Sequence, residues 1–217
     1  MNLKGIKINV LGDSITQGVG ASCIEKCFVN VLAAKTGATV NNYGISGTRI
    51  ARQKLDIPAP HFNTPYCDRI PEMDKDADVV LIFGGTNDFG HGDAPFGEYM
   101  SDDEWTFCGA FNMLMKKLFV AFPDSEIVVL TPLHRASENV TTNEIGIPCH
   151  PLSDYVEMEK KYCEHYGVPV LDLWSVSGIQ PCDEVLRERF APDTLHPNDR
   201  GHERIADRII GFLSTLK

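Results

Sequence analysis

The sequence has no apolar stretch that approaches the length a membrane-spanning helix requires. It also has no cluster of Lys and Arg to offset its net charge of −10 at pH 7, which argues against binding to nucleic acid or to anionic membranes. The first residues lead almost at once into a strand-like pattern and leave no room for a basic, apolar, cleavable signal. We therefore expect a cytoplasmic protein without nucleic-acid or membrane partners.

The cysteine pattern of a secreted or zinc-binding protein is also missing. The seven cysteines are odd in number and scattered, so we predict reduced thiols rather than a framework of disulfides. Cys23 and Cys27 lie four residues apart, but no second pair of ligands accompanies them. We therefore expect core packing at these two residues rather than a zinc site.

Two common motifs do not occur. The sequence has no Gly-x-Ser-x-Gly elbow of the large α/β hydrolase family, and no Gly-Lys-Ser/Thr of an NTP-binding loop follows its first glycine loop. No internal repeat, low-complexity tract or linker divides the chain, and 217 residues suffice for one good-sized core. We expect a single domain over residues 1–217.

What the sequence does contain is an alternation of apolar, strand-like runs and helical patterns. This alternation is typical of an α/β protein with a parallel, doubly wound sheet. Capping-box patterns at Ser22–Glu25 and Ser101–Glu104 predict the starts of two helices, and a last helix is expected from about Asp199 to Leu216. Strands are predicted over 6–11, 38–43, 77–83, 126–130 and 168–173, and mostly irregular structure over 52–76, 89–100, 132–151 and 174–192.

Two helical stretches have an apolar face that we expect to be buried. The first face comprises Ile24, Cys27, Phe28, Val31 and Leu32. The second comprises Trp105, Cys108, Phe111, Met115, Leu118 and Phe122. Trp105, Phe107 and Phe111 are also suitable for the wall of a pocket, although core packing is the commoner fate of such residues.

Ser14 stands at the most informative position in the chain. It follows the predicted strand over 6–11 within a Gly-flanked loop, where open α/β sheets bind their ligands. A serine there becomes a nucleophile if a base, an orienting acid and oxyanion donors converge on it. An isolated Gly-Asp-Ser triplet is otherwise an ordinary capping sequence. Whether Ser14 is a nucleophile or a capping residue therefore depends on whether the base, the acid and the donors are present.

His196 is the base that the sequence predicts. Asp193 precedes it by three residues, close enough within a turn to hydrogen-bond the imidazole and set its tautomer. Pro197 and Asn198 indicate that His196 lies at the start of the last helix. The helix N-terminus disfavours the imidazolium while Asp193 favours it, which leaves a base usable near neutral pH.

Donors for an oxyanion are predicted on three separate loops. A small residue such as Gly47 lets a backbone N–H approach closely, Asn87 carries a side-chain amide, and the Ser14 N–H is a third donor. The alternative for Gly47 is a left-handed turn, and Asn87 and Asp88 are common turn formers. We predict a donor role for Asn87 and structural roles for Asp88 and Asp13.

These residues belong to four blocks that resemble those of the SGNH (GDSL-type) hydrolases. The blocks are Gly12–Ile15, Gly44–Gly47, Gly85–Asp88 and Asp193–His196, and their order and approximate separations match across nearly the whole chain. Ile15 replaces the Leu of the name-giving motif, which is a conservative apolar change.

The resemblance implies a flavodoxin-like, three-layer α/β/α sandwich with a doubly wound parallel sheet, here of five strands. It also implies serine ester hydrolysis without a metal or other cofactor. The nucleophile is then Ser14, the acid–base pair is Asp193 and His196, and the oxyanion donors are the Ser14 N–H, Gly47 and Asn87.

The remaining candidates are expected to have other roles. His202 lies inside the last predicted helix, where packing is the expected role. His91 and His134 lie in predicted irregular segments and are expected to be solvated, with contact to the substrate as the alternative. Ser46 has no obvious base nearby in the sequence, so we do not expect it to be the nucleophile.

The substrate is predicted only as a class, a small-molecule ester. No lipid-facing lid or amphipathic membrane anchor is evident, and the aromatic residues of the irregular segments favour a compact polar pocket. We therefore favour short acyl groups, such as acetyl on a sugar or another small alcohol. A lysophospholipase or thioesterase is the main enzymatic alternative, and a non-catalytic carbohydrate-binding module is a third. The pocket aromatics are Tyr66, Tyr99, Trp105 and Trp174.

Overall fold

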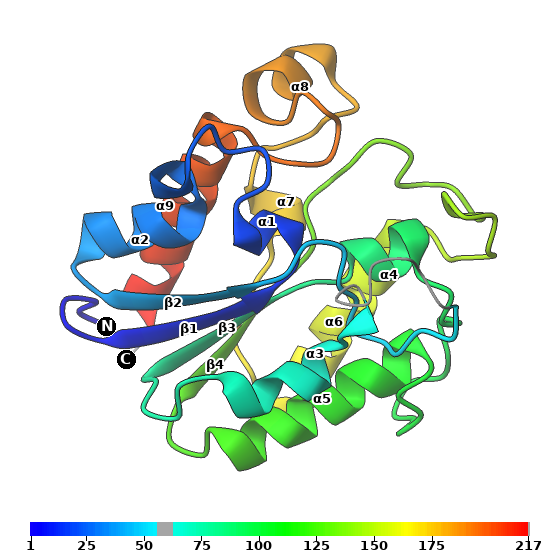
Figure 1. Ribbon diagram of the computed structural model, residues 1–217, viewed down its shortest axis with the longest axis horizontal. Helices are drawn as coiled ribbons and strands as arrows, with labels where there is room; N and C mark the ends of the chain where they lie inside the picture. Colours follow the sequence, from blue (N-terminus) through cyan, green and yellow to red (C-terminus); the bar gives the residue numbers. More distant parts are fainter. Residues whose placement is uncertain (56–62, 217) are drawn as a thin grey trace.

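A five-stranded parallel sheet forms the centre of the computed structural model, which describes residues 1–55 and 63–216 (Figure 1). The strand order is β2-β1-β3-β4-β5, so the order reverses beside β1. The predicted doubly wound, three-layer α/β/α architecture is confirmed. The strands are β1 (Lys7–Gly12), β2 (Thr39–Gly44), β3 (Val79–Phe83), β4 (Glu126–Leu130) and β5 (Val170–Leu171).

The register of the central strands aligns their carboxyl ends. Gly12 at the end of β1 pairs with Gly44 at the end of β2 and with Phe83 at the end of β3. The loops that follow these three strands therefore leave the sheet at one edge, side by side. This is the edge at which ligands bind in sheets of this type.

Helices cover both faces of the sheet. In Figure 1, α2 and α9 lie on one face, while α3, α5 and α6 lie on the other. Short 3₁₀ turns occur at Ile24–Lys26 and Ile70–Glu72. The helices are α1 (Ser14–Gln17), α2 (Phe28–Thr36), α3 (Tyr66–Arg69), α4 (Thr86–His91), α5 (Phe107–Ala121), α6 (Leu152–Tyr166), α7 (Leu173–Val176), α8 (Glu184–Phe190) and α9 (Asp199–Thr215).

Two hydrophobic cores lie on opposite sides of the sheet. Along β3, Val80 and Ile82 point into the core under α3, α5 and α6, while Val79, Leu81 and Phe83 point into the core under α2 and α9. A strand that is buried on both faces has a continuous apolar sequence, and β3 has such a sequence.

The first predicted capping box does not form. The Ser22 hydroxyl donates to the Asp199 carboxylate at 2.7 Å instead, and α2 begins only at Phe28. Ile24 therefore falls in the preceding 3₁₀ turn and is 56% exposed, so its predicted burial is wrong. The side chains of Cys27, Phe28 and Leu32 are fully buried, as expected, whereas Cys23 is exposed and its predicted core packing is wrong.

The second predicted capping box is also displaced. Thr106 caps α5, its hydroxyl accepting from the Gly109 N–H at 3.2 Å, and Trp105 lies before the helix and is 42% exposed. Phe107 and Phe111 are buried in the core rather than in a pocket wall. Other differences concern the ends of elements: part of 89–100 belongs to α4, 174–192 contains most of α7 and all of α8, and β5 is shorter than predicted. Part of the predicted irregular segment 52–76 lies outside the described residues.

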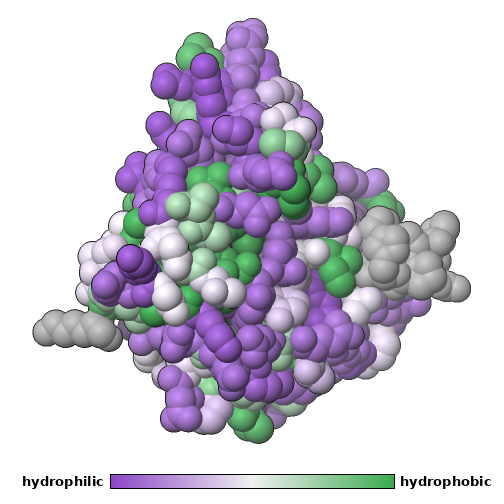
Figure 2. Space-filling view, turned by 60° about the vertical axis from the view of Figure 1, so that its left-hand side comes forward, coloured by the Kyte–Doolittle hydropathy of each residue, from purple (hydrophilic) through white to green (hydrophobic). Residues whose placement is uncertain are grey.

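Hydrophilic side chains dominate the face of the molecule in Figure 2, where apolar residues form small separate groups. Among residues 1–55 and 63–216, none of the helices is both long and apolar enough to cross a membrane.

Candidate active site

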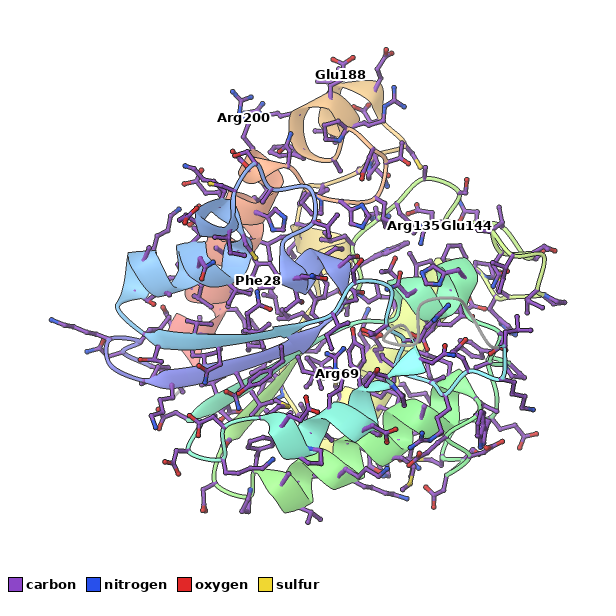
Figure 3. The ribbon with its side chains drawn as sticks, viewed as in Figure 1. Phe28, Arg69, Arg135, Glu144, Glu188 and Arg200 are labelled. Atoms are coloured by element: carbon purple, nitrogen blue, oxygen red, sulfur yellow. The ribbon has the colours of Figure 1, made fainter. Side chains whose placement is uncertain are left out.

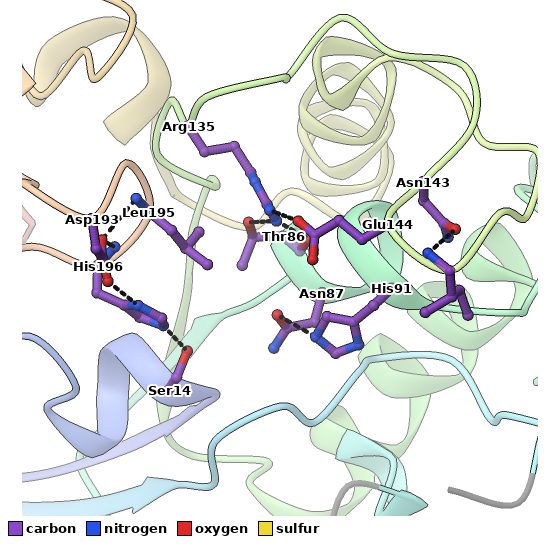
Figure 4. A network of polar contacts seen from close by, with 11 residues as sticks. Ser14, Thr86, Asn87, His91, Arg135, Asn143, Glu144, Asp193, Leu195 and His196 are labelled. Atoms are coloured by element: carbon purple, nitrogen blue, oxygen red, sulfur yellow. Dashed lines mark hydrogen bonds and ion pairs between the residues drawn. The ribbon is translucent and has the colours of Figure 1, made fainter. Parts of the chain in front are cut away.

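Ser14, His196 and Asp193 form a hydrogen-bonded chain at the carboxyl edge of the sheet (Figure 4). The Ser14 Oγ lies 3.0 Å from His196 Nε2, and His196 Nδ1 lies 2.7 Å from Asp193 Oδ2. Because a carboxylate only accepts, Nδ1 carries the proton and Nε2 is left to accept from the Ser14 hydroxyl. Three residues far apart in the sequence thus have the geometry of a nucleophile, a base and an orienting acid.

Ser14 owes its position to the short helix that follows β1. It is the first residue of α1, and the Asp13 carboxylate caps this helix by accepting from the Ile15 N–H at 3.0 Å. Burial raises the pKa of Asp13 to about 7, although the Ile15 N–H and the charge of Arg69 oppose the shift. Asp13 therefore holds the loop through its contact with the Ile15 N–H, in line with the predicted structural role.

The turn before α9 holds His196. Asp193 Oδ1 accepts from the N–H groups of Leu195 at 2.9 Å and His196 at 2.6 Å. Partial burial alone raises the pKa of Asp193, but these two N–H groups and the imidazole outweigh it and bring the pKa below its usual value. Asp193 is therefore a carboxylate at neutral pH, as an acid that orients His196 must be.

Asn87 faces Ser14 from the opposite side of the edge. It lies in the first turn of α4, and its Nδ2 donates to the Thr48 carbonyl at 3.0 Å. The second N–H on Nδ2 has no acceptor among the described residues, and neither do the backbone N–H groups of Ser14 and Gly47. The left-handed φ of 77° at Gly47 is one that glycine adopts without strain.

Two buried side chains fix the loops that carry these groups. Asp88 accepts from the N–H groups of Ile50 at 3.0 Å and Ala51 at 2.9 Å, which ties the loop after β2 to α4. Burial raises the pKa of Asp88 to about 6, and the two N–H groups limit the rise. The predicted structural role of Asp88 fits these contacts.

The second of these side chains is Arg69, which reaches from α3 toward the ends of β1 and β2 (Figure 3). Its guanidinium donates to the carbonyls of Gly12 and Tyr43 and to the Thr48 hydroxyl, at 2.8, 2.6 and 2.8 Å. Burial lowers the pKa of Arg69, while the Tyr66 hydroxyl and the carboxylate of Asp13 counteract this. No sequence pattern indicated this residue, because its acceptors are mostly backbone carbonyls.

The sequence from residue 10 to residue 204 matches the model of the GDSL-like lipase/acylhydrolase family. The chain belongs to this family. It is therefore an ester-hydrolysing enzyme of the SGNH type, as the four sequence blocks predicted.

Solved structures agree with this assignment. A protein from Lactobacillus plantarum is 30% identical, with a TM-score of 0.83 and 99% of each chain covered. A Bacteroides uniformis protein described as a GDSL-like lipase is 21% identical, with a TM-score of 0.70 and 98% of this chain and 97% of that one covered. A two-domain esterase active on acetylated mannans is 22% identical, with a TM-score of 0.62; the match covers 98% of this hydrolase and 50% of the esterase. The last two show a common fold. No curated protein matches the sequence.

Three further histidines of the hydrolase, His202, His134 and His91, have partners among the described residues. His202 is fully buried, accepts from the Phe28 N–H at 3.3 Å and lies 3.2 Å from the Val19 carbonyl, so its predicted packing role is confirmed. His134 was predicted to be solvated, but its ring packs at a tilt against Trp174 and contacts Glu138. His91 was also predicted to be solvated; it lies instead at the end of α4, 3.0 Å from the Asn87 side chain. His91 follows Asn87 by four residues, a spacing that brings two side chains together on a helix. The contact was missed because residues 89–100 were predicted to be irregular.

Of the aromatic residues predicted to build a pocket, Tyr66 is enclosed in the core, so its predicted pocket role is wrong. Tyr66 is fully buried and its hydroxyl donates to the Phe83 carbonyl at 2.9 Å. Tyr99 packs on Tyr162 and Trp174 on His134, with ring centroids 5.0 and 3.7 Å apart.

Thr194 is expected to limit the stability of the hydrolase. Its φ of 74° puts a β-branched residue in the left-handed region, which costs about 1–2 kcal/mol. Glycine removes this strain but gives the unfolded chain more freedom, so Thr194→Gly is expected to raise the free energy of unfolding by about 0.5–1 kcal/mol. Urea unfolding checks this, with Thr215→Gly near the exposed end of α9 as a control expected to be destabilised. A loss of stability in Thr194→Gly would contradict the prediction.

Proposed function

We propose that this enzyme hydrolyses short-acyl carboxylic esters, such as acetyl esters of a sugar or another small alcohol, through a Ser14 acyl-enzyme. The observation that carries the proposal is the chain of contacts from Asp193 through His196 to Ser14, at 2.7 and 3.0 Å. It supplies an activated hydroxyl, and Asn87 and the backbone N–H groups of Ser14 and Gly47 supply donors for the developing oxyanion.

The reaction has two halves. Ser14 Oγ attacks the ester carbonyl while His196 Nε2 takes its proton, and Asp193 stabilises the resulting imidazolium. His196 then gives this proton to the departing alcohol, which leaves an acyl group on Ser14. A water molecule repeats the attack with His196 again as base, releasing the carboxylic acid and restoring the hydroxyl.

The polar surroundings of Ser14 support a short acyl group and a hydrophilic alcohol. The side chains that line the edge opposite His196 are those of Thr86, Asn87, His91 and Arg135, and Arg135 is paired with Glu144 (Figure 4). Long acyl chains bind apolar surface, which these side chains do not offer. The related fold of the esterase active on acetylated mannans is compatible with this substrate class. We further propose that the enzyme acts in the cytoplasm on small molecules, without nucleic-acid or membrane partners; its net charge of −10 supports this.

A panel of p-nitrophenyl esters tests the acyl preference. We expect kcat/KM to fall by at least about tenfold from the acetate to the octanoate, since each unaccommodated methylene group costs transition-state binding. Acetate release from acetylated sugars provides a second readout, and the Ser14→Ala variant measures the background. A kcat/KM that rises with chain length would contradict the proposal and favour a lysophospholipase or thioesterase.

A further inference from the structure

We propose that His91 and Arg49 are positioning residues that fix which way the Asn87 amide faces. His91 Nε2 lies 3.0 Å from Asn87 Oδ1, and an Arg49 terminal nitrogen lies 2.7 Å from His91 Nδ1. The inference rests on the proposed function, because it assumes that Asn87 donates to the oxyanion. It assigns a role to two residues that lie outside the four sequence blocks or at their margin.

Arg49 determines the tautomer of His91. A guanidinium can only donate, so Nδ1 of the imidazole must accept and the ring proton must reside on Nε2. The same Arg49 nitrogen also donates to the His91 carbonyl at 3.0 Å, so it contacts both the ring and the backbone of this residue. The Nε2–H then donates to Asn87 Oδ1, and the chain of donors runs from Arg49 through His91 to Asn87.

This chain leaves one orientation open to the Asn87 amide. Its oxygen accepts from His91, which turns Nδ2 toward the Thr48 carbonyl at 3.0 Å and directs the second N–H away from both partners. In the reversed orientation, Nδ2 would face the His91 N–H and the amide oxygen would face the Thr48 carbonyl. A donor would then face a donor at His91, and an acceptor would face an acceptor at Thr48. The amide would also present an oxygen where the free N–H donor now lies.

The charge state of His91 agrees with this arrangement. Burial, together with the positive charges of Arg49 and Arg135, lowers the pKa of His91 to about 4. The ring is therefore neutral at the pH at which esterases are assayed, and Nδ1 keeps the lone pair that Arg49 requires. Arg49 is itself buried and 4% exposed, so the contact is not one between solvated side chains.

Glutamine and methionine at position 91 separate hydrogen bonding from packing. The two side chains have nearly the same shape, but only glutamine offers an N–H to Asn87 Oδ1. We expect His91→Met to lower kcat for p-nitrophenyl acetate about tenfold with KM changed less than twofold, and His91→Gln to recover most of the loss. This effect is smaller than the about 10²–10³ expected for removing an oxyanion donor, because Thr48 still holds the amide. His165→Ala, on the exposed end of α6, is the control and is expected to leave kcat unchanged.

A double-mutant cycle decides whether His91 acts through Asn87. In an Asn87→Ala background, His91→Met is expected to change kcat by less than twofold, since no amide is left to orient. Without Arg49, the His91 ring can still carry its proton on Nε2, although Arg49 no longer fixes this tautomer. Arg49→Met is therefore expected to lower kcat less than His91→Met. Circular dichroism and urea unfolding verify that each variant is folded.

The outcomes separate the inference from the function on which it rests. Equal kcat for His91→Gln and His91→Met, or an unreduced effect of His91→Met in the Asn87→Ala background, would overturn the inference alone. An Asn87→Ala variant with unchanged kcat would overturn both the inference and the proposed oxyanion role. A Ser14→Ala variant that hydrolyses the ester at the rate of the natural protein would overturn the proposed function as a whole.

Discussion

Ser14→Ala is expected to lower kcat for p-nitrophenyl acetate about a million-fold, the loss seen when the nucleophile of a serine hydrolase is removed. The hydroxyl 3.0 Å from His196 Nε2 is the protein group that forms a bond to the acyl carbon in the proposed mechanism. Alanine leaves the oxyanion donors in place, so a small residual rate over uncatalysed hydrolysis should survive. Initial rates at saturating ester measure the change.

Ser46→Ala is the matched control for this experiment. Ser46 lies on the neighbouring loop, where its backbone N–H donates to Gln17 Oε1 at 2.6 Å, a contact that alanine retains. We expect its kcat to stay within twofold of the natural protein. Covalent labelling by a fluorophosphonate should occur on Ser14 and disappear in Ser14→Ala. An unlabelled natural protein would contradict the proposed mechanism and favour a binding module without catalysis.

Asn87→Ala is expected to lower kcat by about 10²–10³ with little change in KM, because an oxyanion donor acts on charge that develops in the transition state. The donor is the Nδ2–H that is not held by Thr48. Initial rates over a range of ester concentrations separate kcat from KM. The Asn87→Asp variant keeps the shape and the acceptor for His91 but has no donor, so it should lose at least as much.

Asn30→Ala controls for the general effect of removing an amide. Asn30 lies on α2, where its Nδ2 donates to the Ile24 carbonyl at 2.7 Å near the surface. We expect this variant to retain kcat within twofold. A loss in Asn87→Ala that appears in KM with kcat preserved would show that the amide binds ground state and transition state alike, against the proposed role.

The sequence predicted the sheet well because strands buried on both faces leave a strong pattern. The bounds of β4 agree with the predicted 126–130, and the start of α9 agrees as well. The site was also predictable in outline, since parallel strands present their carboxyl ends together and polar residues there are conspicuous. Ser14, Asp193 and His196 lie where this reasoning placed them, within hydrogen-bonding distance of one another.

Contacts between distant segments were beyond the reach of local patterns. Ser22 was predicted to cap its own helix, but its hydroxyl donates instead to the carboxylate of Asp199, which is 177 residues away in the sequence. Tyr66 was expected near the substrate because its segment has little periodicity, yet the adjacent buried strand provides its hydrogen-bond acceptor. The same holds for Arg69, since a residue that binds backbone carbonyls leaves no complementary side chain to find in the sequence.

The two cores on opposite sides of the sheet have a consequence for how this enzyme loses activity. Ile15, next to Ser14 in the chain, belongs to the core under α2 and α9, whereas Phe89, in the same helix as Asn87, belongs to the core under α3, α5 and α6. Loosening of either helical layer would thus disturb the alignment of Ser14 with the Asn87 amide and lower turnover. Conversely, an inhibitor that joins Ser14 to the amide would bridge the two halves, and its binding would raise the melting temperature by mass action.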